Sequence, residues 1–224
     1  MGTLYLVRHG QASFGADDYD RLSDLGRRQC VRLGEWFRRK GVVFEAALVG
    51  TLRRQIESLQ AIDAGLGVQP PVEPLSWPGL NEYDSHAVIR TVHPEPLAKP
   101  ANAEEVRHHF RLLREGLARW MAGTTQPEGM PTYAAFAAGV AGALEHVRTA
   151  HTGDVLLVAS GGPISTAVGQ VLGLAPEATI ELNLRIRNSA VTEFVYHPKR
   201  HHLLTYNTLP HLDDAAFADW VTYT

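Results

Sequence analysis

The amino-acid sequence predicts an α/β fold in which a mostly parallel sheet is covered by helices. Short apolar runs and amphipathic helical patterns alternate along the 224 residues, as they do where parallel strands are joined by helices. The run at 155–159 is apolar throughout, which is typical of a strand buried on both faces of a parallel sheet. The length suits one large α/β unit, so we expect residues 1–224 to form a single domain with a helical insertion at about 87–150.

Composition and charge narrow the classes of protein to which the chain can belong. Its formal net charge of −3 provides no general attraction to nucleic acid or to anionic membranes. Its single cysteine, Cys30, excludes an internal disulfide and a multi-cysteine metal site. No apolar run approaches the roughly 20 residues that span a bilayer, and the first residues lack the charged segment of a signal peptide. We therefore expect a cytoplasmic protein without a nucleic-acid or membrane partner, and its oligomeric state is not indicated.

The first third of the chain predicts two strands, each followed by a helix. Residues 4–7 form the first apolar strand, and Ser23 is the expected N-cap of a helix that stops at Gly41. The run "FEAALVG" predicts the second strand. The segment "TLRRQIESLQAI" predicts the second helix. The apolar positions of this second helix are Leu52, Ile56, Leu59 and Ile62.

The middle of the chain predicts a surface connection and then an α-hairpin. Prolines in 68–80 argue against regular structure in that stretch. A first long helix is expected from Asn102, with Glu105 placed for a capping box, and a second from about Tyr133. The flexible stretch 123–129 between them predicts a hairpin over 102–149. The side chains expected in the core are Val106, Phe110, Leu113, Leu117, Trp120, Tyr133, Phe136, Val140, Leu144 and Val147.

The last third predicts a buried strand, a helix and two further strands. The apolar run that begins at 154 breaks at the Gly-Gly pair of 161–162 into a helix, with Pro163 in its first turn. Alternating patterns at 180–196 and 201–207 predict the last two strands.

Two of the expected strands end in residues suited to binding an anion. The first strand runs into Arg-His-Gly at 8–10, and the buried later strand runs into Ser-Gly-Gly at 160–162. In an open parallel sheet, ligands bind beyond the carboxyl ends of the strands, where helix N-termini favour negative charge. Arg54 lies in the first turn of a helix, where a cation is unfavourable unless an anion is nearby. Because guanidinium groups grip phosphate in a bidentate fashion, the sequence predicts a phosphate site.

Several segments, in order along nearly the whole chain, resemble the histidine phosphatase superfamily, which includes the cofactor-dependent phosphoglycerate mutases. "LYLVRHGQA" resembles the family signature, and "RLSDLGRRQ" resembles its Leu-Ser/Thr-x-x-Gly segment. "GTLRRQIES" is similar to its Ser-Pro-Leu-x-Arg-Ala-x-x-Thr segment, "GLNEYD" to its Leu-x-Glu segment, and "VLLVASGGPI" to its last core motif. The resemblance implies a three-layer α/β/α sandwich with a mostly parallel central sheet and a helical-hairpin insertion beside or over the pocket.

The resemblance also implies roles for particular residues. His9 would be a nucleophile that forms a phosphohistidine, Arg8 and Arg54 would hold the nonbridging oxygens, and Glu82 would be the acid and base. The implied activity is hydrolysis of a phosphate monoester or a phosphohistidine, without metal or cofactor. The implied partner is a small phosphorylated substrate or a phosphoprotein. The expected phosphate-binding residues are Arg8, Arg54, Ser160, Gly161 and Gln11.

Departures from the family pattern leave alternatives open. Ser160 stands where the last motif has a second histidine, and Gln11 stands where glutamate often follows the signature, which argues against a mutase. The alternatives are a pseudoenzyme that binds a phosphorylated compound with little turnover, a phosphoglycerate mutase-type phosphotransferase, and a serine hydrolase with Ser160 as nucleophile. Val158 breaks the Gly-x-Ser-x-Gly pattern that such a hydrolase needs. His86 and His211 are candidates for a replacement imidazole.

Overall fold

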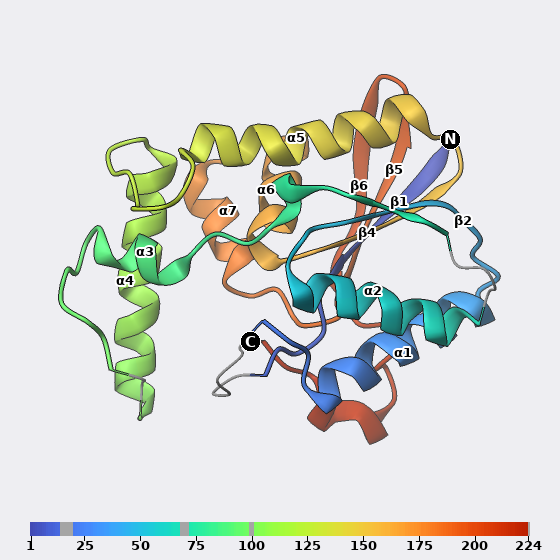
Figure 1. Ribbon diagram of the computed structural model, residues 1–224, viewed down its shortest axis with the longest axis horizontal. Helices are drawn as coiled ribbons and strands as arrows, with labels where there is room; N and C mark the ends of the chain where they lie inside the picture. Colours follow the sequence, from blue (N-terminus) through green and yellow to red (C-terminus); the bar gives the residue numbers. More distant parts are fainter. Residues whose placement is uncertain (14–19, 68–71, 99–100, 224) are drawn as a thin grey trace.

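A six-stranded sheet forms the centre of the molecule, with strand order β3-β2-β4-β1-β5-β6 (Figure 1). The computed structural model describes residues 1–13, 20–67, 72–98 and 101–223. β5 is antiparallel to both of its neighbours, and the other adjacent pairs are parallel, which confirms the mostly parallel sheet. The strands are β1 (Gly2–Arg8), β2 (Phe44–Val49), β3 (Pro74–Ser76), β4 (Asp154–Ala159), β5 (Val191–His197) and β6 (Arg200–Thr208).

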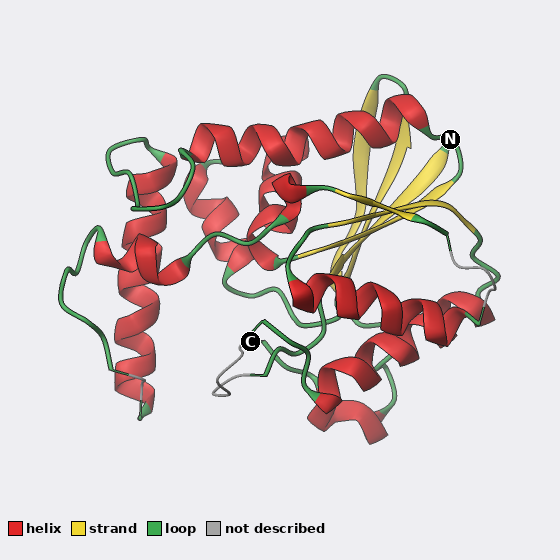
Figure 2. Cartoon of the chain, viewed as in Figure 1, coloured by secondary structure: helices red, strands yellow, loops and turns green. Residues whose placement is uncertain are grey.

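Helices cover both faces of this sheet, as the three-layer sandwich requires. α1 (Asp24–Arg39) and α2 (Arg53–Leu66) lie on one side, and α5 (Tyr133–Ala150) and α6 (Gly161–Leu172) lie on the other (Figure 2). The core is accordingly split into two clusters by the sheet. Val7 of β1 packs with the α1 and α2 side chains, whereas its neighbour Leu6 packs with those of α5 and α6. This alternation follows from the period of two along a strand.

The first helix begins and ends where its sequence signals predict. Ser23 accepts a hydrogen bond at its Oγ from the backbone N–H of Gly26, which satisfies one of the unpaired donors at the helix start. Gly41, just past the end, has a φ of +68°, a conformation that glycine adopts without steric cost. A Cβ at Gly26 would lie 2.1 Å from the carbonyl oxygen of Gln11. The start of α1 therefore packs directly on the loop that follows β1.

The expectation that the proline-rich stretch has no regular structure is wrong for its described part. Residues 74–76 form β3, which pairs in parallel with β2, and Pro78–Leu80 form a 3₁₀ turn. β3 is the edge strand of the sheet, the position at which proline is tolerated because one side of the strand needs no ladder hydrogen bonds. Residues 68–71 of the stretch lie outside the described residues.

The two long helices form a corner rather than the expected hairpin. α4 (Ala103–Met121) runs across the end of α5 instead of back along it, and projects beyond the sheet beside the short α3 (Ser85–Arg90) (Figure 1). Only the second half of α4 is packed, so Val106 and Phe110 are 40% and 42% exposed rather than part of the core. Ile56 of α2 is likewise exposed. The other apolar positions expected on α4 and α5 are buried or partly buried.

One expected strand is shorter than its pattern suggested. The alternation at 180–196 predicted a strand throughout, but its first residues belong to α7 (Pro176–Asn183), and β5 starts only at Val191. Pro176 sits in the first turn of this helix, where its fixed φ suits the helix and its missing N–H costs nothing. No helix in the described part of the chain combines the length and apolar character needed to cross a membrane.

Candidate active site

The sheet topology brings His9 and Ser160 to the same end of the sheet, beyond the carboxyl ends of two central strands. Arg8 pairs with Ala159 in the parallel register of β1 and β4, and the N–H of His9 donates to the carbonyl of Ala159 at 2.9 Å. His9 and Ser160 therefore follow neighbouring parallel strands at their carboxyl ends. This is the part of an open α/β sheet where ligands bind.

His9 is the central residue of the candidate site, and its side chain is almost fully buried. Its Nδ1 lies 2.7 Å from the carbonyl oxygen of Gly10, and because a carbonyl only accepts, Nδ1 carries the proton. Nε2 is then the unprotonated nitrogen, and it accepts a hydrogen bond from Nε of Arg54 at 3.2 Å. Burial, with the charges of Arg8 and Arg54, holds the pKa of His9 well below its ordinary value. The ring is thus neutral near pH 7, with its lone pair at Nε2.

The loop that carries His9 is clamped between α1 and α2. The N–H of Gly10 donates to Oγ of Ser58 at 3.0 Å, and that hydroxyl donates to the carbonyl of Arg54 at 2.6 Å. A Cβ at Gly10 would lie 2.4 Å from the carbonyl oxygen of Gly26, so only glycine allows this approach. The backbone that follows His9 is therefore held by both helices.

Arg54 and Arg8 are positioned by different parts of the chain. Arg54 is only 8% exposed, and its Nη1 forms an ion pair with Asp20 at 2.6 Å. Nη1 of Arg8 donates to the carbonyls of Ile186 at 2.6 Å and Tyr223 at 3.1 Å. Asp20 is not among the site residues predicted from the sequence, because nothing in its local pattern distinguishes it from an acidic residue on the surface. Its carboxylate shows that the guanidinium of Arg54 lies where an anion can reach it.

Glu82 lies at the N-terminus of α6, close to both arginines. Its carboxylate accepts hydrogen bonds from the N–H of Gly162 at 3.1 and 3.2 Å and from the N–H of Tyr83 at 3.2 Å. Burial raises the pKa of Glu82, against the opposing effects of the Gly162 N–H and of the charges of Arg54 and Arg8. A Cβ at Gly162 would lie 2.2 Å from the carboxylate, so the glycine makes the approach possible. The site thus combines a neutral imidazole with a carboxyl group that holds its proton more tightly than usual.

The sequence matches the model of the histidine phosphatase superfamily (branch 1) over residues 4–209. The chain belongs to this superfamily. A phosphoserine phosphatase mutant of Entamoeba histolytica in complex with phosphoserine has a similar fold, with a TM-score of 0.66 and 18% sequence identity over 95% of this chain and 100% of that chain. A phosphoglycerate mutase of Bacillus anthracis has a TM-score of 0.66 and 16% identity over 94% of each chain. A mycobacterial glucosyl-3-phosphoglycerate phosphatase has a TM-score of 0.65 and 21% identity over 93% of this chain and 99% of that chain. At these identities the likeness shows the fold, and it confirms the phosphoglycerate mutase-like architecture.

Ser160 forms a hydrogen bond with a residue that sequence reasoning missed. Its fully buried hydroxyl accepts a hydrogen bond from Nε2 of Gln55 at 2.9 Å. The same Nε2 donates to the carbonyl of Leu80 at 2.8 Å, and Oε1 of Gln55 accepts from the N–H of Leu52 at 3.2 Å. In the Ser-Pro-Leu-x-Arg-Ala-x-x-Thr segment that "GTLRRQIES" resembles, the position of Gln55 holds alanine, and this difference is the signal that could have identified Gln55. Compared with the motifs that the sequence resembles, the side chain is thus longer at position 55 and smaller at position 160.

The described side-chain hydrogen bonds of Gln11 and His211 are to residues other than His9. Oε1 of Gln11 accepts from the hydroxyl of Ser23 at 2.8 Å. His211 is buried, and its Nε2 lies 2.9 Å from Oγ of Ser189. His86 is exposed in the first turn of α3. Within the described part of the chain, neither of these histidines hydrogen-bonds to His9, and no group of His, Cys, Asp and Glu side chains is arranged to hold a metal ion.

Proposed function

We propose that the protein is a phosphatase that hydrolyses a phosphate monoester or a phosphohistidine through a phosphohistidine on His9. The observation that carries this proposal is the neutral imidazole whose unprotonated Nε2 faces the guanidinium of Arg54. A nucleophile in this state needs no base to activate it, because its lone pair is already available. Arg54 and Arg8 supply fixed positive charge close to the atom that would attack phosphorus.

In the first step Nε2 of His9 bonds to phosphorus while the bond from phosphorus to the leaving oxygen breaks. Glu82 gives its proton to that oxygen, a role favoured by its raised pKa. In the second step water attacks phosphorus, Glu82 takes the proton from the water, and the bond from nitrogen to phosphorus breaks. Inorganic phosphate leaves, and His9 and Glu82 return to their starting states.

Ser160 would contribute a neutral hydroxyl at the position of the superfamily's second imidazole. Its oxygen accepts from Gln55, so its own proton is available to a nonbridging phosphoryl oxygen. Neutral hydrogen bonds are roughly half as strong as charge-assisted ones. We therefore expect a slow phosphatase, with Arg8 and Arg54 providing most of the charge stabilisation.

The test is direct detection of the intermediate. Rapid quenching with a ³²P-labelled ester should trap an acid-labile, base-stable phosphoprotein in the wild type. His9→Ala should form none, whereas His86→Ala, which changes an exposed histidine, should form as much as the wild type. Wild-type turnover in His9→Ala would refute the proposal.

A pseudoenzyme is the second candidate, because Ser160 and Gln55 together fill the place of an imidazole. Vanadate binding with no detectable turnover of any ester would favour it. The serine hydrolase has less support, since the described partner of the Ser160 hydroxyl is an amide, which cannot act as a base. Gln11 in place of glutamate continues to argue against the mutase.

A further inference from the structure

A groove of about 470 Å³ lies between α4 and the segment that follows α7. Arg107, Arg111 and Arg114 line it from α4, and Arg185 lines it from the opposite wall. Phe110, one of the residues that the sequence pattern had assigned to the core, forms part of the apolar surface of the groove and is 42% exposed. The groove therefore combines four guanidinium groups with an aromatic face.

Positive charge exceeds negative charge in this groove. Glu104 also lines it, and Nε of Arg114 pairs with Glu181 at 2.7 Å. In the described part of the chain, no ion pair involves Arg107 or Arg185. Glu104 and Glu181, which interacts electrostatically with Arg185, offset only part of the charge of the four arginines. The groove is therefore complementary to a negatively charged group.

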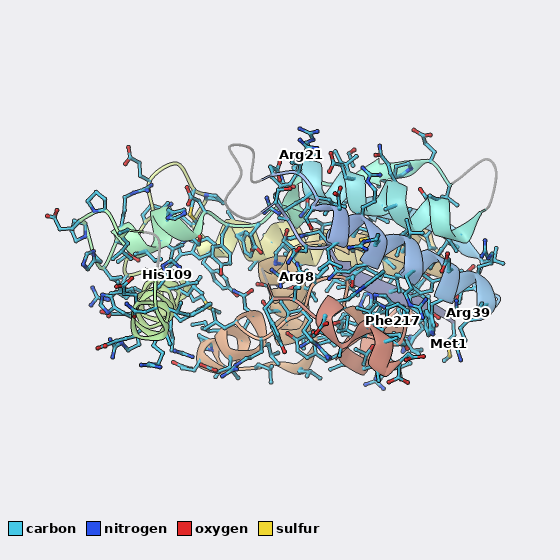
Figure 3. All side chains as sticks on the ribbon, turned by 90° about the horizontal axis from the view of Figure 1, so that it is seen from below. Met1, Arg8, Arg21, Arg39, His109 and Phe217 are labelled. Atoms are coloured by element: carbon cyan, nitrogen blue, oxygen red, sulfur yellow. The ribbon has the colours of Figure 1, made fainter. Side chains whose placement is uncertain are left out.

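Segment 183–186 borders both the groove and the candidate active site. A Cβ on Gly161 would lie 2.9 Å from Cγ2 of Ile186 and 3.0 Å from Oδ1 of Asn183, so both ends of this segment pack against the start of α6. The carbonyl of Ile186 also accepts the hydrogen bond from Arg8. Since consecutive Cα atoms lie about 3.8 Å apart, the backbone of Arg185 is one residue from the partner of Arg8. Figure 3 shows α4, marked by His109, to one side of Arg8, with side chains between them.

We propose that this groove binds a second anionic group of the substrate. The preferred substrate is then a small phosphate ester whose leaving group carries an apolar portion and, beyond it, a carboxylate or a second phosphate. The phosphoryl group would lie between Arg8 and Arg54, the apolar portion against Phe110, and the second anion between Arg107 and Arg185. This inference rests on the proposed function, because it describes the leaving-group side of the same site.

Binding of phosphonates tests the groove without requiring turnover, since their carbon–phosphorus bond is not hydrolysed. Calorimetry would compare benzylphosphonate with its 4-carboxy and 4-phosphonomethyl derivatives. We expect at least one derivative to bind the wild type about tenfold more tightly or better, and the two derivatives distinguish a carboxylate from a second phosphate. Arg107→Gln and Arg185→Gln should each remove most of that preference and leave the affinity for benzylphosphonate within about twofold. Arg119→Gln, on the same helix but paired with Glu115, is the matched control and should change neither affinity.

The outcomes separate the groove from the catalytic proposal. If benzylphosphonate binds as tightly as both derivatives, or if Arg119→Gln causes the same loss as Arg107→Gln, the groove assignment is wrong and the phosphate site stands. If no phosphonate binds, both proposals fail. If an acidic phosphopeptide binds more tightly than any phosphonate, the small-molecule assignment is overturned in favour of a protein partner.

Discussion

Placing an imidazole at position 160 should not raise activity unless Gln55 is shortened at the same time. Ser160 is fully buried, and the amide nitrogen of Gln55 lies 2.9 Å from its hydroxyl, so the pocket has no space for a ring. Overpacking of this kind costs about 1–3 kcal/mol. Ser160→His alone should therefore lower the free energy of unfolding by about 1–3 kcal/mol and should not increase activity.

The double variant Gln55→Ala/Ser160→His should behave differently, because removal of the amide makes room for the ring. A charge-assisted hydrogen bond to the phosphoryl group would then replace a neutral one, and about 1.4 kcal/mol of transition-state stabilisation corresponds to a tenfold gain in rate. Gln55→Ala alone should lose about 1–3 kcal/mol of unfolding free energy, since the carbonyl of Leu80, the N–H of Leu52 and the hydroxyl of Ser160 lose their partner.

The assay is a double-mutant cycle over the wild type, both single variants and the double variant. It measures kcat on phenyl phosphate and the free energy of unfolding in urea. We expect the double variant to be faster and more stable than the sum of the effects of the two single changes predicts. If Ser160→His alone is as active as the double variant, Gln55 does not occupy the space of the ring. If the double variant is no faster than Gln55→Ala, an imidazole at 160 does not face the phosphoryl group.

Three further predictions concern other groups. Glu82→Gln should slow the hydrolysis of phenyl phosphate by roughly 10²-fold or more and that of 4-nitrophenyl phosphate much less, because a good leaving group needs less protonation. Equal losses of rate on both esters would mean that Glu82 positions the substrate and does not transfer a proton. Asp20→Asn should tighten vanadate binding several-fold by removing the carboxylate that competes for Arg54, whereas weaker binding would mean that Asp20 orients the guanidinium. Burial lowers the pKa of His211 to about 3, so its contribution to stability is present above the unfolded value of 6.5 and lost as pH falls. His211→Asn should therefore flatten the pH dependence of the unfolding free energy by about 1.4 kcal/mol per pH unit near pH 5, and exposed His86→Asn should not.

Local signals in the sequence predicted the elements that depend on near neighbours. The N-cap at Ser23, the strand that delivers His9 and the turn at 160–162 each follow from a few adjacent residues, and the structure has all three. The carboxyl-end rule for parallel sheets then accounts for the contact between Arg54 and His9.

Features that depend on distant contacts could not be predicted in this way. The proline-rich strand β3 forms because β2 offers it an edge, and the corner between α4 and α5 depends on how much of each helix finds a partner. Asp20 and Gln55 act through side chains 34 and 105 residues away in sequence, at Arg54 and Ser160. No local pattern indicates the Asp20 pair, and for Gln55 the one signal is its difference from the motif that "GTLRRQIES" resembles.

The hydrogen bonds of Arg8 have a consequence for biosynthesis. β1 is made first, yet its neighbours in the sheet, β4 and β5, are made late, and Arg8 bonds to a carbonyl 215 residues further on. At about 5–20 residues per second, a ribosome needs roughly ten to forty seconds to synthesise that separation. Until β4 and β5 have been synthesised, the strand that precedes His9 has both edges unpaired, which is a state prone to aggregation. Arg8 can form its hydrogen bond to Tyr223 only after that segment has emerged, so a nascent chain stalled earlier lacks this restraint on a residue of the candidate site.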